Sequence, residues 1–278
     1  MKKISRRSFL AAAGLSVAAL ALTACGGSAS SVASSVASSA SSAAASTSAA
    51  AGELTTVEAG KLTMATNAAF PPYEMTTDAG EFEGIDIETA QAIADKLGLE
   101  LQIDDMDFDA ALLSVQQGKA DIVMAGVTVT DERKNVMDFS DSYATGIQSI
   151  IVPEGSDIAS PDDLAGKKIG TQRGTTGYIY CSDDFGDDAV VAYDNGLTAV
   201  QALNNGQVDA VVIDNAPAQE FVAANPGLVI LDTSYAEEDY AIGMAKGSAL
   251  EDAINAALEE LKADGTLQSI VDKYITAE

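Results

Sequence analysis

From Lys61 onward the chain alternates short apolar runs with segments that carry apolar residues at helical spacing. Strands are predicted for KLTMAT, LELQID and ADIVMAG, and helices for the segments between them. The segment IETAQAIADKLG places Ile87, Ala90, Ala94 and Leu97 on one stripe. A strand–helix–strand order favours parallel strands joined by right-handed helical crossovers. This part of the chain is therefore predicted to form an α/β layer structure.

The same alternation begins again after Pro153 and predicts a second lobe. Its predicted strands are KKIGTQ, AVVAY, VDAVVID and LVILD, and its predicted helices are one that opens at Thr175, TAVQALNNG and APAQEFVAAN. Extended stretches flank this set at QSIIVPEG and EEDYAIGMAKG, and two helices broken at Gly265 close the chain. If the closing helices pack on the first set, the chain crosses between the lobes twice and forms a hinge.

The first 25 residues are predicted to be a cleavable export signal. Lys2, Lys3, Arg6 and Arg7 precede an apolar run of about 17 residues, whereas a spanning helix needs roughly 20, and the sequence LTAC then ends at Cys25. This pattern resembles a bacterial lipoprotein leader in which Cys25 becomes the lipidated N-terminus, and SRRSFL also resembles a twin-arginine motif. An uncleaved anchor helix is the alternative. Both interpretations place the rest of the chain outside the cytoplasm.

Residues 26–58 are predicted to be a Ser/Ala-rich flexible linker. They include no aromatic residue and almost no large aliphatic one, so they cannot bury enough apolar surface to offset their ordering entropy. A marginal helix is the alternative, and serine disfavours it by bonding its own backbone. As a coil, the linker would span roughly 30 Å and could hold a folded domain away from a membrane.

The charge and the histidine count exclude several function classes. With 15 basic and 42 acidic residues, the formal net charge is −27, which repels nucleic acid and anionic lipid headgroups. The absence of histidine removes Ser-His-Asp and Cys-His pairs and His-based zinc sites. If lipid takes Cys25, Cys181 has no disulfide partner, and a buried, inert thiol is favoured over a reactive one. We predict a monomer without cofactor, metal site or nucleic-acid partner.

Two stretches resemble known motifs but have the wrong spacing. DMDFD at 105–109 opens like a calcium loop, yet Ala110 and Gln116 stand where that loop needs Gly and Glu, so a solvated strand end and a helix N-cap are favoured. GTQRGTTG at 170–177 fits neither glycine-rich phosphate motif. The helix that opens near Thr175 would still present free N–H groups to an anion, with an ordinary Thr N-cap as the alternative.

Two charged residues at element ends have two interpretations each. Arg133 follows ADIVMA in the stretch AGVTVTDERK, where it could be a solvated helix cation or an anion ligand. Asp214 ends VDAVVID and could cap the helix that starts near Ala216. It could equally point its carboxylate into the crevice at the carboxyl end of the sheet, where open α/β sheets bind ligands.

Five stretches together resemble the family 3 bacterial extracellular solute-binding proteins, the receptors of polar amino-acid ABC transporters. In order from about Lys61 to Tyr274 they are GIDIETAQAIADKLG, GKADIVMAGVTVTDERKNVMDFSDSY, DLAGKKIGTQRGTTGYIY, ALNNGQVDAVVIDNAPA and KADGTLQSIVDKY, and the T-x-T-x-E-R block is specific to the family. The resemblance implies a two-lobed α/β periplasmic-binding-protein fold, a type II Venus flytrap with two hinge strands. Lobe 1 is then expected at 59–151 and 242–278, and lobe 2 at 152–241.

The resemblance also implies how the cleft binds a ligand. Arg133 would grip the α-carboxylate with its planar guanidinium, and Asp214 from the other lobe would take the ammonium. The anion site would be completed by the backbone of Gly126, by the hydroxyl and N–H of Thr128, and by the N–H groups around Thr175 and Thr176. Phe70 and Phe108 match aromatic walls. Asn67 and Gln172 suit a neutral polar side chain, and Asn67 stands where family members that bind cationic side chains tend to have an acid.

The implied function is the extracytoplasmic capture of a polar L-amino acid by a lipid-anchored protein that delivers it to an ABC permease. No catalysis is expected. An exported enzyme on the same scaffold, resembling cyclohexadienyl dehydratases, is one alternative, and an adhesin or sensor lipoprotein is another. The fold alone cannot separate these classes. An enzyme would need a general acid with a tuned pKa in the cleft.

Overall fold

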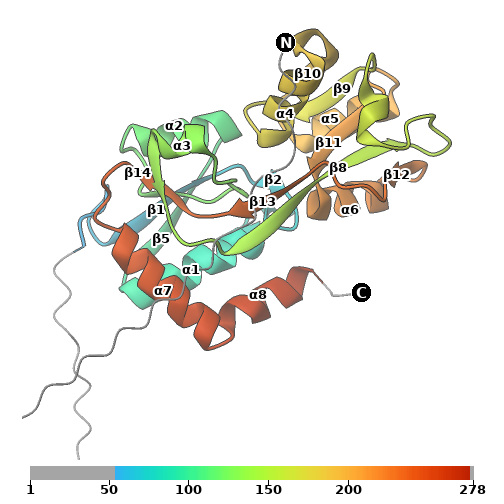
Figure 1. The fold of residues 1–278 in the computed structure, drawn as a ribbon. Coiled ribbons are helices and arrows are strands. Elements are labelled where there is room, and N and C mark those ends of the chain that lie inside the picture. Colours follow the sequence, from blue (N-terminus) through green and yellow to red (C-terminus); the bar gives the residue numbers. More distant parts are fainter. Residues whose placement is uncertain (1–53, 276–278) are drawn as a thin grey trace, which may run out of the picture. The chain divides into compact units, whose positions relative to one another are not determined.

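Two main β-sheets, each with its own helices, make up the part of the chain that the computed structural model describes, residues 54–275 (Figure 1). The predicted signal peptide, Cys25 and the linker up to residue 53 lie outside the described residues. Within 54–275, no helix combines the length and the apolar character that crossing a membrane requires.

The first sheet has the strand order β5-β1-β6-β14-β7. β1 (Lys61–Thr66) lies parallel to both β5 (Glu100–Asp105) and β6 (Ile122–Val123), as expected of strands joined by helical crossovers. Five of the six residues of β1 are buried, which is typical of a central parallel strand covered on both faces. β14 (Gly243–Ala245) pairs antiparallel with β6 and with β7 (Met137–Phe139) at the edge.

Helices from both ends of the described chain cover this sheet. α1 (Ile85–Leu97) shares one hydrophobic core with α7 (Glu251–Ala263) and α8 (Thr266–Tyr274), and Figure 1 shows these teal and red helices together. α2 (Phe108–Gln116) packs into a second cluster with β6 and β14. The sequence left open which surface the closing helices cover. They pack on the first lobe, so the chain leaves this lobe and returns to it.

The second sheet has the strand order β10-β9-β11-β8-β12. β9 is parallel to β10 and β11, and β8 is antiparallel to β11 and β12. The strand predicted at LVILD therefore runs in the direction of β11 but is separated from it by β8. The elements of this lobe are β8 (Ala144–Pro153), η1 (Pro161–Leu164), β9 (Ile169–Gln172), α4 (Thr176–Phe185), η2 (Asp187–Ala189), β10 (Val190–Tyr193), α5 (Gly196–Asn204), β11 (Ala210–Asp214), α6 (Asn215–Ala224) and β12 (Leu228–Ile230).

Two paired strands connect the lobes. β8 follows β7 of the first sheet, and β13 (Ala236–Tyr240) leads back to β14 of that sheet. The two strands pair antiparallel, with Tyr240 opposite Ala144 and Ala236 opposite Gln148. They are the two crossings that the sequence predicted at QSIIVPEG and EEDYAIGMAKG. The boundaries at 151/152 and 241/242 stay a proposal, since β8 already begins at Ala144.

The three strands of a small third sheet were not predicted. β2 (Ala69–Phe70), β3 (Glu74–Thr76) and β4 (Phe82–Glu83) form a small antiparallel sheet whose strands are too short to show an alternating pattern. The single-turn helix α3 (Asp131–Lys134) is N-capped by Thr130. The run ADIVMAG, predicted as one strand, forms only the two residues of β6 before the chain bends toward the cleft.

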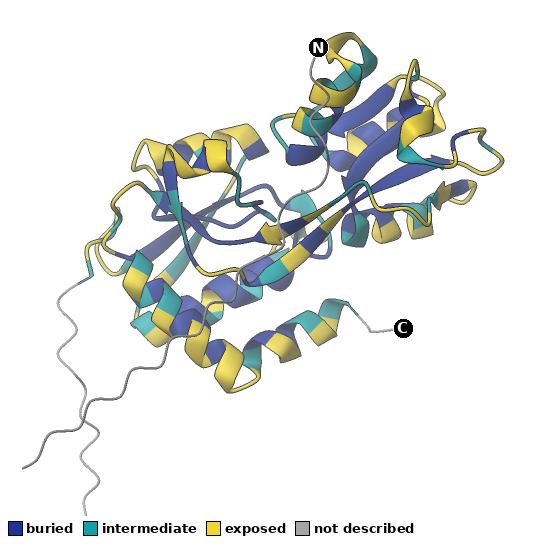
Figure 2. Cartoon of the chain, viewed as in Figure 1, coloured by how far each residue is buried: buried dark blue, intermediate teal, exposed yellow. Residues whose placement is uncertain are grey.

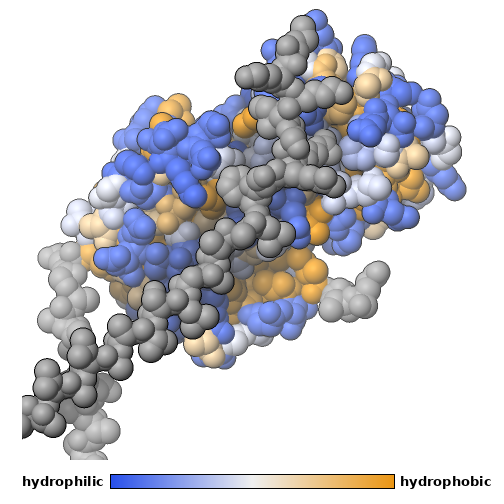
Figure 3. Space-filling model, in the orientation of Figure 1, coloured by the Kyte–Doolittle hydropathy of each residue, from blue (hydrophilic) through white to orange (hydrophobic). Residues whose placement is uncertain are grey.

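Polar residues predominate on the surface, and buried residues form the core. Buried residues lie along the strands and on the inner sides of the helices (Figure 2). Hydrophilic residues predominate on the described face in Figure 3, in line with the excess of acids.

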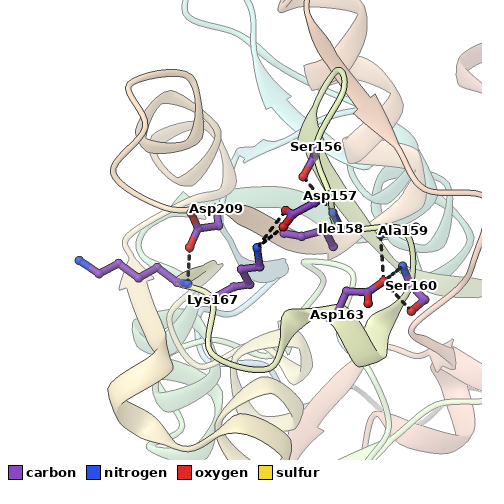
Figure 4. A network of polar contacts seen from close by, with 9 residues as sticks. Ser156, Asp157, Ile158, Ala159, Ser160, Asp163, Lys167 and Asp209 are labelled. Carbon is purple, nitrogen blue, oxygen red and sulfur yellow. Dashed lines mark hydrogen bonds and ion pairs between the residues drawn. The ribbon is translucent and has the colours of Figure 1, made fainter.

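In the loop after β8, Asp163 accepts hydrogen bonds from the amides of Ala159 and Ser160, and Lys167 pairs with Asp157 (Figure 4). These exposed contacts join residues within the loop that carries η1, and none of these residues lines the cleft.

Cys181 lies in the core of the second lobe, on α4. It is free and fully buried among aliphatic side chains. Burial raises the pKa of its thiol to about 12, so very little reactive thiolate exists at neutral pH. The burial that the sequence favoured for this thiol is confirmed.

Candidate functional site

One cavity lies between the lobes at the carboxyl ends of the parallel strands. Gln172 ends β9 and Asp214 ends β11 in the second sheet, and Asn67 follows β1 in the first. Ligands of open α/β sheets bind at such ends. The space between its lining atoms, counted together with its opening to solvent, is about 450 Å³. It brings together all ten residues that the sequence predicted: Asn67, Phe70, Phe108, Gly126, Thr128, Arg133, Gln172, Thr175, Thr176 and Asp214.

Arg133 is a buried cation, not the solvated helix residue of the alternative interpretation. It is 8% exposed. Its Nη1 donates to the Thr128 carbonyl at 2.8 Å and its Nη2 to the Gly174 carbonyl of the other lobe at 3.1 Å. Its Cζ lies 5.4 Å from the centroid of the Phe108 ring. Burial lowers the pKa of Arg133, while the charge of Glu238 raises it. The two carbonyl contacts leave further guanidinium N–H groups for an anion.

Asp214 combines the two roles that its position in the sequence left open. Its Oδ1 accepts from the Ala216 amide at 3.1 Å and caps α6, and its Oδ2 accepts from the Ile147 amide at 2.7 Å. The carboxylate also lines the cavity and is hydrogen bonded to the Tyr240 hydroxyl. Burial raises the pKa of Asp214 to about 6, although these hydrogen bonds lower it. A cation in the cavity would relieve the cost of keeping this carboxylate ionised.

Main-chain donors face the cavity from both lobes. Thr175 caps α4 by accepting from the Tyr178 amide, so the predicted helix start is confirmed and the N–H groups of Thr176 and Gly177 are left for an anion. In the first lobe, Val129 N donates to Asp239 and Val127 O accepts from Ala241. The N–H of Thr128, between these two residues, therefore points away from the hinge strand β13. Both sets of donors suit a carboxylate near Arg133.

The Gly126 amide departs from its expected role. It donates to Asp86 Oδ2 at 3.0 Å, and the Tyr143 hydroxyl donates to the same oxygen at 2.8 Å. That N–H is therefore engaged within the first lobe, and only the Gly126 carbonyl stays open to a ligand. Glu74 lines the cavity beside this cluster. Burial raises the pKa of Glu74 well above its ordinary value, and burial raises the pKa of Asp86 to about 6.

Asn67 and Gln172 meet across the cleft. Gln172 Nε2 donates to Asn67 Oδ1 at 2.9 Å, and Asn67 Nδ2 donates to the Met106 carbonyl at 2.9 Å. Both side chains are buried. The amide pair therefore joins the lobes directly, and part of its hydrogen-bonding capacity is already used.

Sequence reasoning missed four polar residues of this site. Glu74, Gln148 and Tyr240 line the cavity, and Glu238 hydrogen bonds to two of the lining threonines. β13 alternates exposed and buried residues, with Glu238 and Tyr240 on the buried side. The letters EEDY do not alternate in polarity, so the available signal for Glu238 was only its spacing of two residues from the aromatic Tyr240. No comparable pattern marks Glu74, whose strand is three residues long.

The comparisons with known proteins agree with this architecture. The family model of the bacterial extracellular solute-binding proteins, family 3, matches residues 62–277. The chain belongs to this family. It is 33% identical over 275 residues to a probable histidine-binding protein of Neisseria gonorrhoeae, covering 96% of this chain and 95% of that one. It is also 33% identical over 228 residues to the arginine-binding extracellular protein ArtP of Bacillus subtilis, with coverages of 78% and 87%.

Solved structures extend the comparison to the fold. An ancestral arginine-binding protein bound to glutamine superimposes with a TM-score of 0.75 at 43% identity, covering 78% of this chain and 99% of that chain. The arginine-, lysine-, histidine-binding protein ArtJ of Geobacillus stearothermophilus gives a TM-score of 0.75 at 34% identity, with coverages of 78% and 96%. This family 3 protein therefore has the two-lobed periplasmic-binding-protein fold with two hinge strands. These relatives are named as binding proteins, not as enzymes.

Proposed function

We propose that this family 3 protein binds the zwitterion of one polar L-amino acid between its lobes and serves an ABC transporter. One observation carries the proposal: the buried charges of Arg133 and Asp214 come from different lobes and line the same cavity. A free amino acid offers one opposite charge to each of them. No single lobe supplies both contacts, so a bound ligand stabilises the closed arrangement by its higher affinity for it.

The carboxylate pole is assigned to Arg133. The guanidinium can bind a carboxylate through two parallel hydrogen bonds, and the N–H groups of Thr128 and of the first turn of α4 face the same region. The ammonium pole is assigned to Asp214 in the second lobe. Removing such ions from water costs several kcal/mol each, which is why each pole needs several partners. Even a micromolar site would bind with only about −8 kcal/mol after that cost.

The side-chain part of the cavity is assigned to Phe70, Phe108 and the amide pair Asn67–Gln172. Aromatic rings cover an aliphatic stem without demanding a geometry of their own, and the amide oxygen of Gln172 can accept a hydrogen bond. This set favours a neutral polar side chain. Ancestral arginine-binding proteins have been solved bound to glutamine and bound to arginine. Both amino acids are therefore suitable probes of this chain.

The cellular role extends the proposal. Cys25 would carry a lipid after cleavage of the leader at residues 1–25, and the linker at 26–58 would place the two lobes outside the cell membrane. The closed, loaded protein would deliver its amino acid to the transmembrane subunits of an ABC permease. We propose a monomer for this step, because the two halves of the binding site come from one chain.

Calorimetry with a panel of the twenty L-amino acids tests the proposed function. We expect one-to-one binding of at least one polar L-amino acid. An exported enzyme would instead convert a cyclic carboxylic acid, and a sensor or adhesin would bind none of the panel. Absence of binding across the panel would contradict the proposal, and turnover of a cyclic acid by the same sample would favour the enzyme.

Replacing Gly146 should disrupt the ammonium site. A Cβ at this position would lie 2.5 Å from Tyr240 Cζ and 2.7 Å from Asp214 Oδ2, closer than van der Waals contact allows. We expect Gly146→Ala to displace the Asp214 carboxylate and to weaken amino-acid binding at least tenfold in calorimetry. Thr145→Ala, at the exposed neighbouring position of β8, is the matched control. Equal affinities of the two variants would contradict the assignment of Asp214.

A further inference from the structure

Glu238 is a buried carboxylate that connects both lobes and both hinge strands. It lies in β13 and is 6% exposed. Its Oε2 accepts from Thr128 Oγ1 of the first lobe at 3.1 Å and from Thr176 Oγ1 of the second lobe at 3.0 Å. Gln148 Nε2, from the other hinge strand β8, donates to the same oxygen at 3.0 Å. Three donors from three parts of the fold thus meet at one atom.

The partners of this carboxylate depend on lobe closure. A buried carboxylate is tolerated only when donors or cations compensate for its lost hydration. Thr176 opens α4 in the second lobe, whereas Thr128 is bridged to Tyr240 at the first-lobe end of β13. The negative charge of Glu238 also acts to raise the pKa of Arg133 in the first lobe and the pKa of Tyr180 in the second. Separating the lobes would break up this set of partners.

The same contacts decide which hydrogen-bonding role the two threonines can play. A threonine hydroxyl carries a single proton, and in this structure both hydroxyls lie within hydrogen-bond distance of Glu238 Oε2, to which they can only donate, and 3.5 Å from each other. The oxygens of Thr128 and Thr176 therefore face the cavity as acceptors. A ligand carboxylate, which only accepts, must then take its hydrogen bonds from Arg133 and from main-chain N–H groups. The expected contribution of the Thr128 hydroxyl to the carboxylate site is not available in this geometry.

We infer that Glu238 is a positioning residue of the binding site. It holds the Thr128 and Thr176 hydroxyls together across the cleft, stabilises the closed arrangement before a ligand arrives, and reserves the carboxylate site for Arg133 and the backbone. The part of this inference that concerns affinity rests on the proposed function. The part that concerns closure does not, because it refers to the protein without ligand.

Amide hydrogen exchange of the full chain tests the closure in the absence of ligand. We expect Glu238→Ala to accelerate exchange at least tenfold both in residues 126–130 and in residues 174–178, the two segments that Glu238 connects. Glu238→Gln keeps an acceptor oxygen and should stay within about threefold of the wild type. Glu237→Ala removes the same charge from an exposed neighbour on β13 and is the matched control. Equal exchange in Glu238→Ala and Glu237→Ala would overturn the inference.

Calorimetry with L-arginine and L-glutamine provides the second readout. The probe that the wild-type chain binds should lose at least tenfold in affinity in Glu238→Ala and recover to within about threefold in Glu238→Gln. If the wild type binds neither L-arginine nor L-glutamine, that result counts against the proposed function only. The hydrogen-exchange result would still decide the role of Glu238.

A double-mutant cycle covers the case that Glu238→Ala does not fold. Thr176→Val removes the hydroxyl that Glu238 holds, so its effect on exchange at 126–130 should be markedly smaller in a Glu238→Leu background, which keeps the bulk but has no acceptor oxygen, than in the wild type. Additive effects of Thr176→Val and Glu238→Leu would overturn the inference.

Discussion

Arg133→Met should abolish amino-acid binding while leaving the protein folded. Methionine can keep the packing against Phe108, but the ligand carboxylate would lose its buried cation and both hydrogen bonds of the guanidinium fork. Truncating one partner of a buried, hydrogen-bonded charge pair costs about 2–5 kcal/mol, which corresponds to roughly 30-fold to several thousand-fold in affinity. Calorimetry with the best amino acid of the panel measures the loss.

Two further variants make this result specific. Arg133→Lys keeps the positive charge but not the planar fork, so we expect an intermediate loss of affinity. Arg173→Met removes an exposed arginine from the second lobe, where the side chain is 55% exposed, and should bind like the wild type. Binding by Arg133→Met within threefold of the wild type would show that the ligand carboxylate does not lie against Arg133.

Asp214→Asn should weaken amino-acid binding by removing the negative charge that is assigned to the ligand ammonium. The variant can still cap α6, because asparagine is as good an N-cap as aspartate, but it has no charge for the ammonium group. We expect the affinity to fall by about 2 kcal/mol or more, roughly 30-fold. Asp232→Asn, at an exposed position of the same lobe, is the matched control. Wild-type affinity in Asp214→Asn, measured by calorimetry at pH 7.5, would refute the ammonium assignment.

The pH dependence of binding distinguishes an Asp214 that binds the ligand ammonium from an Asp214 that only supports the fold. Burial raises the pKa of Asp214 to about 6 in the ligand-free protein. Because the ammonium group prefers the ionised carboxylate, wild-type affinity should fall as the pH drops below about 6 and approach a tenfold loss per pH unit at lower pH. The weak binding by Asp214→Asn should lack this step. Parallel pH profiles of the two proteins would contradict the assignment.

The same raised pKa affects the stability of the ligand-free protein with the opposite sign. A carboxyl group that binds its proton more tightly when folded adds stability that is fully present below its unfolded pKa of 3.8 and is lost as the pH rises through about 6. The free energy of unfolding of Asp214→Asn should therefore decrease less between pH 4 and pH 7 than that of the wild type. Asp86, whose pKa is also raised to about 6 by burial, remains in both proteins and cancels from the comparison.

The periodic parts of the chain could be predicted because their pattern reports burial directly. β11 is entirely buried, and its residues 210–213 form an uninterrupted apolar run, which marks strands of this kind. Asp214 became a candidate for the same reason, since a charged residue at the end of a buried strand must lie at the rim of the sheet. The helix start at Thr175 followed from local capping chemistry. These features depend on neighbours in the sequence.

The polar contacts of the site could not be predicted in this way. Asp86 looks like an ordinary acid in the first turn of a helix, yet it is fully buried and accepts from Tyr143, 57 positions along the chain. Its second bond takes the Gly126 amide that was expected to bind the ligand. Nothing within either segment marks the other as its partner.

The sequence by itself determined the two α/β lobes and the charged residues at the strand ends, because burial along a strand or helix follows from its own residues. The tertiary structure alone decided which polar groups meet: Asn67 with Gln172, Gly126 with Asp86, and both threonines with Glu238. The physical reason is that a hydrogen bond needs its two atoms within about 3 Å. That distance between residues far apart in the chain is set only when the elements pack.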